Sequence, residues 1–111
     1  MVVTIMKTIE QAKFNVGQII HHKLFNYRGV IFDVDPAFQG SDEWYNKVAK
    51  SHPPKDQPWY HVLVHNGGYN TYVAERNLEA DWSSDDIENP LVEAFFSKLE
   101  NGVYISNRPS N

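Results

Sequence analysis

Five histidines are the first side chains in this sequence that could do chemistry, because imidazole binds metals and transfers protons near neutral pH. His21 and His22 are neighbours on a predicted strand, so their side chains point to opposite faces. His61 and His65 share a face but lie about 13 Å apart along a strand, too far for one ion with bonds of about 2 Å. A cross-strand cluster of His21 or His22 with His61 remains open. Structural roles are the simpler interpretation, so we predict no metal site and no cofactor.

Asp33 and Asp35 are the second candidate for chemistry, because two carboxylates on one strand face can divide acid and base roles. An aspartate just before Pro36 is also ordinary turn chemistry at a strand end, and we favour that interpretation. The chain has no cysteine and shows no nucleophile elbow, phosphate-binding loop or zinc-protease motif. We therefore predict no catalytic residues and no enzymatic activity.

A group of aromatic and basic residues is typical of small binding domains, which stack bases, methyl groups or peptides on flat rings. We predict these residues to lie on the surface and to contact DNA, the cations at phosphates and the rings at bases. The alternative, in which the rings belong to the core or to a subunit contact, stays open. The DNA-binding candidates are Lys23, Arg28, His22, Tyr27, Trp59 and Tyr72.

The distribution of charge limits this interpretation. The net charge is −4, but residues 1–32 carry +3, residues 33–75 carry −3 and residues 76–111 carry −4. A tight DNA site neutralises roughly 6–10 phosphates, and the first segment holds only four basic side chains. DNA binding therefore requires several copies of the chain, and we expect a homo-oligomer.

Alternating apolar residues predict a mainly β protein. Residues 1–12 show no period and are expected to form a flexible arm. Gly29 suggests a bend or bulge in its strand, with Val30, Phe32 and Val34 on one face. Asn66-Gly67-Gly68 is a strong hairpin signal. The predicted strands are residues 19–24, 27–35, 59–65 and 69–74.

The hairpin alternation divides its side chains between two faces, whichever two residues form the turn. The predicted core face carries Tyr60, Val62, Val64, Tyr69, Thr71 and Val73. The opposite face carries Trp59, His61, Leu63, His65 and Tyr72.

Two helical segments are expected. Ser41 is a suitable N-cap for a helical insertion over about residues 41–51. Asn89 and Pro90 open a C-terminal helix over about residues 90–99, which Gly102 ends. The apolar stripe on this helix either packs on the sheet or docks another protein or subunit. The protein-interaction candidates on it are Phe95, Phe96 and Leu99.

Together these elements predict a single domain over residues 13–111, built as a small SH3-like β-barrel with the two helical additions. No apolar run approaches the roughly 18 residues of a membrane span. The first residues are poorly suited to a signal peptide. We expect a cytoplasmic protein with no membrane partner.

Three separated blocks of the sequence resemble the YccV-like (HspQ, hemimethylated DNA-binding) family over about residues 13–80. The blocks are Lys13-Phe14 through Val16-Gly17-Gln18 and His22 to Leu24-Phe25; Tyr27-Arg28-Gly29-Val30-Ile31-Phe32-Asp33-Val34-Asp35-Pro36; and Gln57-Pro58-Trp59-Tyr60-His61-Val62 with Tyr72-Val73-Ala74-Glu75-Arg76-Asn77-Leu78. The resemblance implies an SH3-like barrel, a homo-oligomer such as a trimer and no catalysis. It also implies binding to hemimethylated DNA, and help in degrading denatured or regulatory proteins by an ATP-dependent protease such as Lon.

Two functions of different classes follow. The first is a non-enzymatic heat-shock protein that binds DNA and assists protein degradation. The second is a protein-interaction adaptor or specificity factor for the protease, with no physiological DNA binding. The net charge of −4 suits the second better, since an adaptor needs no basic patch.

Overall fold

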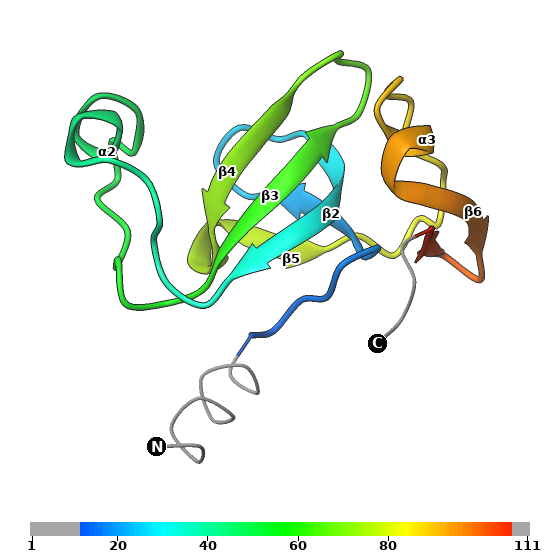
Figure 1. The fold of residues 1–111 in the computed structure, drawn as a ribbon, viewed down its shortest axis with the longest axis horizontal. Helices are drawn as coiled ribbons and strands as arrows, with labels where there is room; N and C mark the ends of the chain where they lie inside the picture. The colour runs from blue at the N-terminus through cyan, green and yellow to red at the C-terminus, as the bar shows by residue number, and fades with distance from the viewer. Residues whose placement is uncertain (1–11, 108–111) are drawn as a thin grey trace.

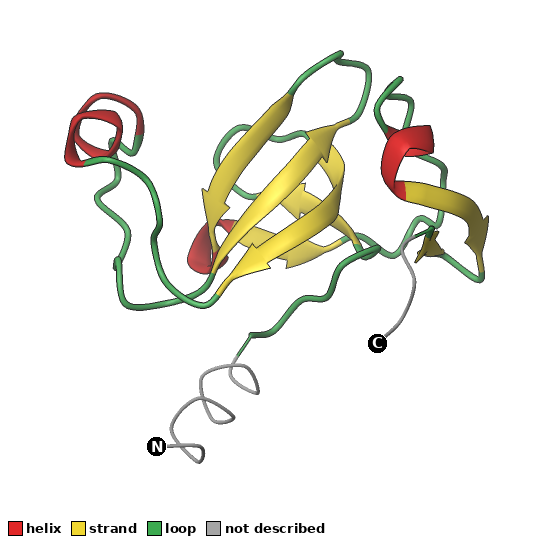
Figure 2. Cartoon of the chain, in the orientation of Figure 1, coloured by secondary structure: helices red, strands yellow, loops and turns green. Residues whose placement is uncertain are grey.

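The computed structural model describes residues 12–107, and strands dominate it (Figure 1, Figure 2). The predicted arm over residues 1–12 lies outside the described residues except for Ala12. The strands are β1 (Ile19–His22), β2 (Arg28–Asp35), β3 (Trp59–Val64), β4 (Asn70–Ala74), β5 (Leu78–Ala80), β6 (Phe96–Glu100) and β7 (Val103–Ser106). The helices are α2 (Asp42–Val48), α3 (Val92–Phe95) and the 3-10 turn η1 (Glu75–Asn77).

The five strands β1–β5 form one antiparallel sheet in the order β4-β3-β2-β1-β5. β4 and β5 are its two edges, and no ladder joins them within residues 12–107. The prediction of a mainly β protein is confirmed, whereas a closed barrel is not seen. No helix in this part of the chain is both long and apolar enough to cross a membrane.

The sheet curls around an inner apolar cluster to which every one of its strands contributes. The cluster contains Ile20, Ile31, Tyr60, Val62, Val73 and Leu78. Of the predicted core face, Tyr60, Val62 and Val73 are thus confirmed, but Tyr69 is 57% exposed beside the hairpin turn. Gly29 lets β2 approach β3 closely, and the bulge lies between Ile31 and Asp33 instead.

That bulge changes which side chains share a face. Val30 and Phe32 pack in an outer cluster, while Val34 packs in the inner cluster with Ile31. The predicted common face of Val30, Phe32 and Val34 is therefore wrong at Val34, because one extra residue in β2 reverses the alternation beyond it.

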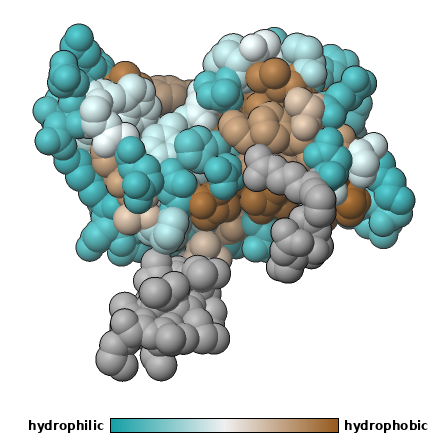
Figure 3. Space-filling view, viewed as in Figure 1, coloured by the Kyte–Doolittle hydropathy of each residue, from teal (hydrophilic) through white to brown (hydrophobic). Residues whose placement is uncertain are grey.

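The C-terminal segment covers the outer face of the sheet, but not as the predicted helix over residues 90–99. Helix α3 ends at Phe95, and residues from Phe96 onward pair as the hairpin β6–β7. Asn101 and Gly102 connect these strands with φ angles of 53° and 78°, the left-handed pair that a tight two-residue hairpin turn requires. Figure 3 shows hydrophobic residues gathered where this hairpin meets the sheet.

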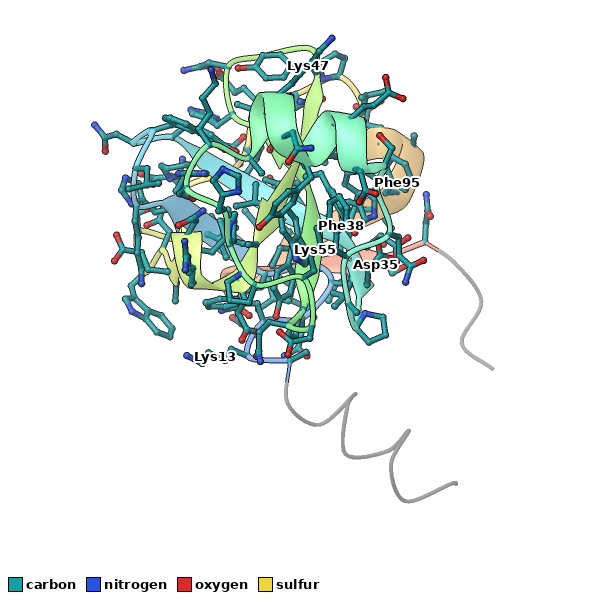
Figure 4. All side chains as sticks on the ribbon, turned by 90° about the vertical axis from the view of Figure 1, so that its left-hand side faces the viewer. Lys13, Asp35, Phe38, Lys47, Lys55 and Phe95 are labelled. Carbon is teal, nitrogen blue, oxygen red and sulfur yellow. The ribbon has the colours of Figure 1, made fainter. Side chains whose placement is uncertain are left out.

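The predicted helical insertion is confirmed as α2. The Ser41 side chain accepts a hydrogen bond from the Trp44 N–H at 3.1 Å, so Ser41 is the N-cap. Tyr45 and Phe38 from the insertion pack against Trp59 and cover the other end of the outer face. In Figure 4, Phe38 lies beneath the helix and Lys47 on its far side.

Gly29→Ala tests the close approach of β2 and β3. A Cβ at Gly29 would lie 2.5 Å from Val62 Cγ1 and 2.6 Å from the Leu63 carbonyl oxygen. We expect a loss of about 2–3 kcal/mol in the free energy of unfolding, measured by urea denaturation. Gly68→Ala is the control, since a Cβ there meets nothing within 4 Å; equal stability of the two variants would contradict this packing.

Candidate functional site

One groove brings together four of the six DNA-binding candidates. It has a volume of about 630 Å³ and lies along β4, with residues of the α2 segment and of the β1–β2 turn in its walls. Figure 1 shows where β4 and α2 lie in the fold. We call it the β4 groove. Its lining residues are Asn70–Ala74 of β4, His22, Leu24, Phe25 and Tyr27 of the turn, Trp44, Val48–Ser51 and Pro53 of the insertion, and Trp59 and Asn77.

The buried side chain of His22, at the end of β1, holds the β1–β2 turn that forms one wall of the groove. Its side chain is 3% exposed, and its Nδ1 accepts hydrogen bonds from the N–H groups of Leu24 and Phe25 at 3.1 and 3.0 Å. Burial, and to a lesser extent the nearby His21, lowers the pKa of His22. The ring is therefore neutral, and with Nδ1 accepting, the proton lies on Nε2.

His21 has the opposite electrostatic environment. Its ring nitrogens bond Asn26 Oδ1 at 2.7 Å and Glu79 Oε2 at 2.8 Å. Both partners are acceptors for a protonated ring, and these hydrogen bonds, that to Asn26 first, raise the pKa of His21. Neighbouring histidines on β1 thus prefer different protonation states.

The candidate rings are held by specific partners. Tyr27 Oη lies 2.7 Å from Thr71 Oγ1, and Tyr72 donates to Asp35 Oδ2 at 2.7 Å. Trp59 is 1% exposed and donates from Nε1 to the Pro54 carbonyl at 3.1 Å. The prediction that Trp59 is a surface residue is wrong, because the insertion covers the face on which it lies.

Arg28 is also committed to the fold. Its Nε donates to Asp81 Oδ2, and its Nη2 donates to the Asp85 carbonyl at 2.5 Å. Burial alone would raise the pKa of Asp81, but hydrogen bonds from the Ser83 N–H and from Arg28 outweigh it, so that pKa is lowered. A phosphate would have to displace these acceptors, so the arrangement does not favour the predicted phosphate contact of Arg28.

Cations nevertheless gather around the β4 groove. Lys50 lines it, the backbone N–H of Lys23 bonds the carbonyl of the lining residue Asn77 at 2.8 Å, and Arg76 Nη2 bonds the carbonyl of the lining residue Ser51 at 2.6 Å. No aspartate or glutamate is among the lining residues. The lining of the β4 groove thus carries one cation and no carboxylate, on a chain of net charge −4.

Asp33, Asp35 and His61 form a separate cluster at the end of β2. Their donor atoms lie within 4.8 Å of one another. Asp35 Oδ2 already accepts from Tyr72 and lies 3.0 Å from His61 Nε2, while Asp33 Oδ1 accepts from the Val34 N–H at 2.9 Å. These contacts fit the structural interpretation of both carboxylates. His21 and His22 make other contacts and take no part in this cluster.

The protein-interaction candidates do not meet the groove. Phe96 is 4% exposed, and Phe95 and Leu99 pack partly buried against the same outer cluster. The stripe packs on the sheet, which was the simpler of the two interpretations. Leu24, Phe25 and Val48 line the groove but were not among the predicted site residues. The i,i+4 spacing of Trp44 and Val48, which puts both on one side of a helix, was a signal for Val48.

Comparison with known families agrees with the resemblance seen in the sequence. The family model YccV-like, described as hemimethylated DNA-binding protein YccV like, matches residues 12–103. The chain belongs to the YccV-like family. The matched residues include the whole β4 groove and its basic rim, by which we mean Lys23, Lys50 and Arg76. The match ends within the hairpin β6–β7.

The two neighbouring histidines should give folding stability a maximum near pH 6.5, their ordinary pKa. The raised pKa of His21 stabilises the fold below that pH, and this contribution is lost as the pH rises through the folded-state value. The lowered pKa of His22 has the reverse effect: stability is full above pH 6.5 and falls as the pH drops. Urea unfolding midpoints across pH 5.5–8 measure both slopes around that value.

His21→Gln should remove the decline in folding stability above the maximum. His22→Asn should remove the decline below it, and its side-chain oxygen can replace Nδ1 as the hydrogen-bond acceptor. Profiles of both variants that match the unchanged protein would contradict these assignments.

Proposed function

We propose that this YccV-like protein is a non-enzymatic DNA-binding protein that prefers DNA methylated on one strand. The family description supports this, and the observation that carries it in this chain is a set of basic residues at the β4 groove: Lys50 lines it, while Lys23 and Arg76 bond lining residues. The cations would contact phosphates, while the exposed Phe25 ring would face a base or its methyl group.

One chain offers too few of these cations for tight binding, since each phosphate contact needs a positive partner. We therefore propose that several copies act together, a trimer being the arrangement that the family resemblance implies. We further propose that the curled sheet is an SH3-like barrel, which the strand order and the 3-10 turn between β4 and β5 support.

A second candidate is an adaptor that brings proteins to an ATP-dependent protease such as Lon. Three apolar side chains at the β4 groove favour it: Leu24, Phe25 and Val48 are 58%, 72% and 54% exposed. Apolar surface gathered in one hollow is typical of protein interaction sites.

Replacing the groove cations should weaken DNA binding in a salt-dependent manner. We expect Lys23→Gln with Lys50→Gln to lower affinity for a hemimethylated duplex. The slope of log K against log salt should fall by about 0.9 for each phosphate that the variant no longer neutralises. Fluorescence anisotropy at several salt concentrations measures both, with unmethylated and fully methylated duplexes for comparison.

Lys98→Gln is the matched control, because Lys98 lies on β6 and pairs with Glu100 at 3.2 Å. If the double variant keeps the affinity and slope of the unchanged protein, the groove cations do not contact DNA.

A further inference from the structure

Strand β4 is an edge strand with outward-facing hydrogen-bonding groups. Within residues 12–107 it pairs with β3 alone. The Val64 N–H bonds the Tyr69 carbonyl at 3.2 Å, and the Glu75 N–H bonds the Pro58 carbonyl at 3.1 Å. Bonding alternates along an antiparallel pair, so every second residue between these bonds points its N–H and C=O away from β3. Those residues are Asn70, Tyr72 and Ala74. Ala74 is 2% exposed, so Asn70 and Tyr72 form the accessible part of the edge.

The β4 groove runs along this edge. All five residues of β4 line it, with Leu24 and Phe25 exposed on one wall and Val48 on the other. An uncovered edge strand can pair with a strand of another chain. Natural proteins commonly prevent this pairing with charged side chains or proline on the edge. Apolar side chains flank the edge of β4 instead, which favours its pairing with another strand.

The chemistry of the lining selects the kind of occupant. The exposed side chains of Leu24 and Val48 are aliphatic. Among the lining rings Phe25 is mostly exposed, but Trp59 is buried and Tyr72 is bonded to Asp35, so aliphatic surface is prominent in the groove. The lining carries Lys50 and no carboxylate. These features fit apolar side chains on an extended backbone that also carries an acidic residue.

We propose that an extended segment of another protein adds to β4 as a further strand, with apolar side chains in the groove and an acidic side chain near Lys50. Its backbone bonds the outward groups of Asn70 and Tyr72. This inference goes beyond DNA binding and gives the adaptor function a site. It concerns the purified chain alone, so it can hold or fail independently of DNA and of any protease.

A short synthetic peptide tests the proposal: acetylated Glu-Val-Thr-Val-Thr-Val-Glu amide with a fluorescent label, titrated with the full chain. Two versions carry N-methyl groups on alternate residues, either on all the valines or on all the threonines. In a β strand one alternation faces β4 and the other faces solvent. We expect one methylated peptide to bind like the parent and the other about tenfold or more weaker.

Amide hydrogen exchange identifies the edge directly. Bound peptide should slow exchange at Asn70 and Tyr72, while Thr71 and Val73 change little because their N–H groups already face β3.

Side-chain variants test the groove. Val48→Asp and Phe25→Asp should each weaken peptide binding about tenfold, because they replace exposed apolar contacts and repel the acidic peptide. Trp82→Asp is the control, since Trp82 is 86% exposed and does not line the groove. Thermal melting of each variant shows that the fold is retained.

Several outcomes overturn the proposal. These are no binding of the parent peptide, equal binding of both methylated peptides, or exchange protection that is absent at β4. The edge would instead be a subunit contact if the peptide fails to bind and Val48→Asp dissociates an oligomer in sedimentation velocity. It would be a nucleic-acid surface if the aspartate variants weaken duplex binding and leave peptide binding unchanged.

Discussion

The rest of this structure depends on the burial of β3 on both faces. β3 lies within the sheet, between β2 and β4, and Tyr60 and Val62 fill the inner cluster. Leu63 and Trp59 lie under separate outer covers, the C-terminal hairpin and the α2 insertion. A strand covered on both faces needs apolar side chains at almost every position. Much of the chain's 14% aromatic content is therefore core and not recognition surface.

This constraint decides what is left for binding. Arg28 donates to Asp81 and to the Asp85 carbonyl, so this DNA-binding candidate belongs to the fold. The remaining capacity for recognition lies at the edge strand β4, where apolar side chains and a basic rim meet. DNA phosphates and an acidic extended peptide are both attracted by such a rim. Both proposed functions therefore depend on the same part of the surface.

Elements with strong local signals could be predicted from the sequence: the central hairpin from its alternation, and α2 from Ser41. Residues 96–100 could not, because Phe95, Phe96 and Leu99 fit a helical stripe equally well, and Asn101-Gly102 is both a helix stop and a hairpin turn. The two alternatives differ in tertiary packing: the segment forms the hairpin β6–β7, which covers the outer face of the sheet. Four site candidates were found because the strands and turn that carry them adjoin β4. The exposure of Leu24, Phe25 and Val48 arises only from tertiary packing.

The most direct test of this account is the environment of Trp59. Trp44→Phe with Trp82→Phe leaves Trp59 as the single tryptophan among the three in the chain. Burial on β3 predicts short-wavelength emission and weak quenching by acrylamide. Emission typical of a water-exposed indole, freely quenched by acrylamide, would contradict the burial of β3 and would place the Trp59 side chain on the surface.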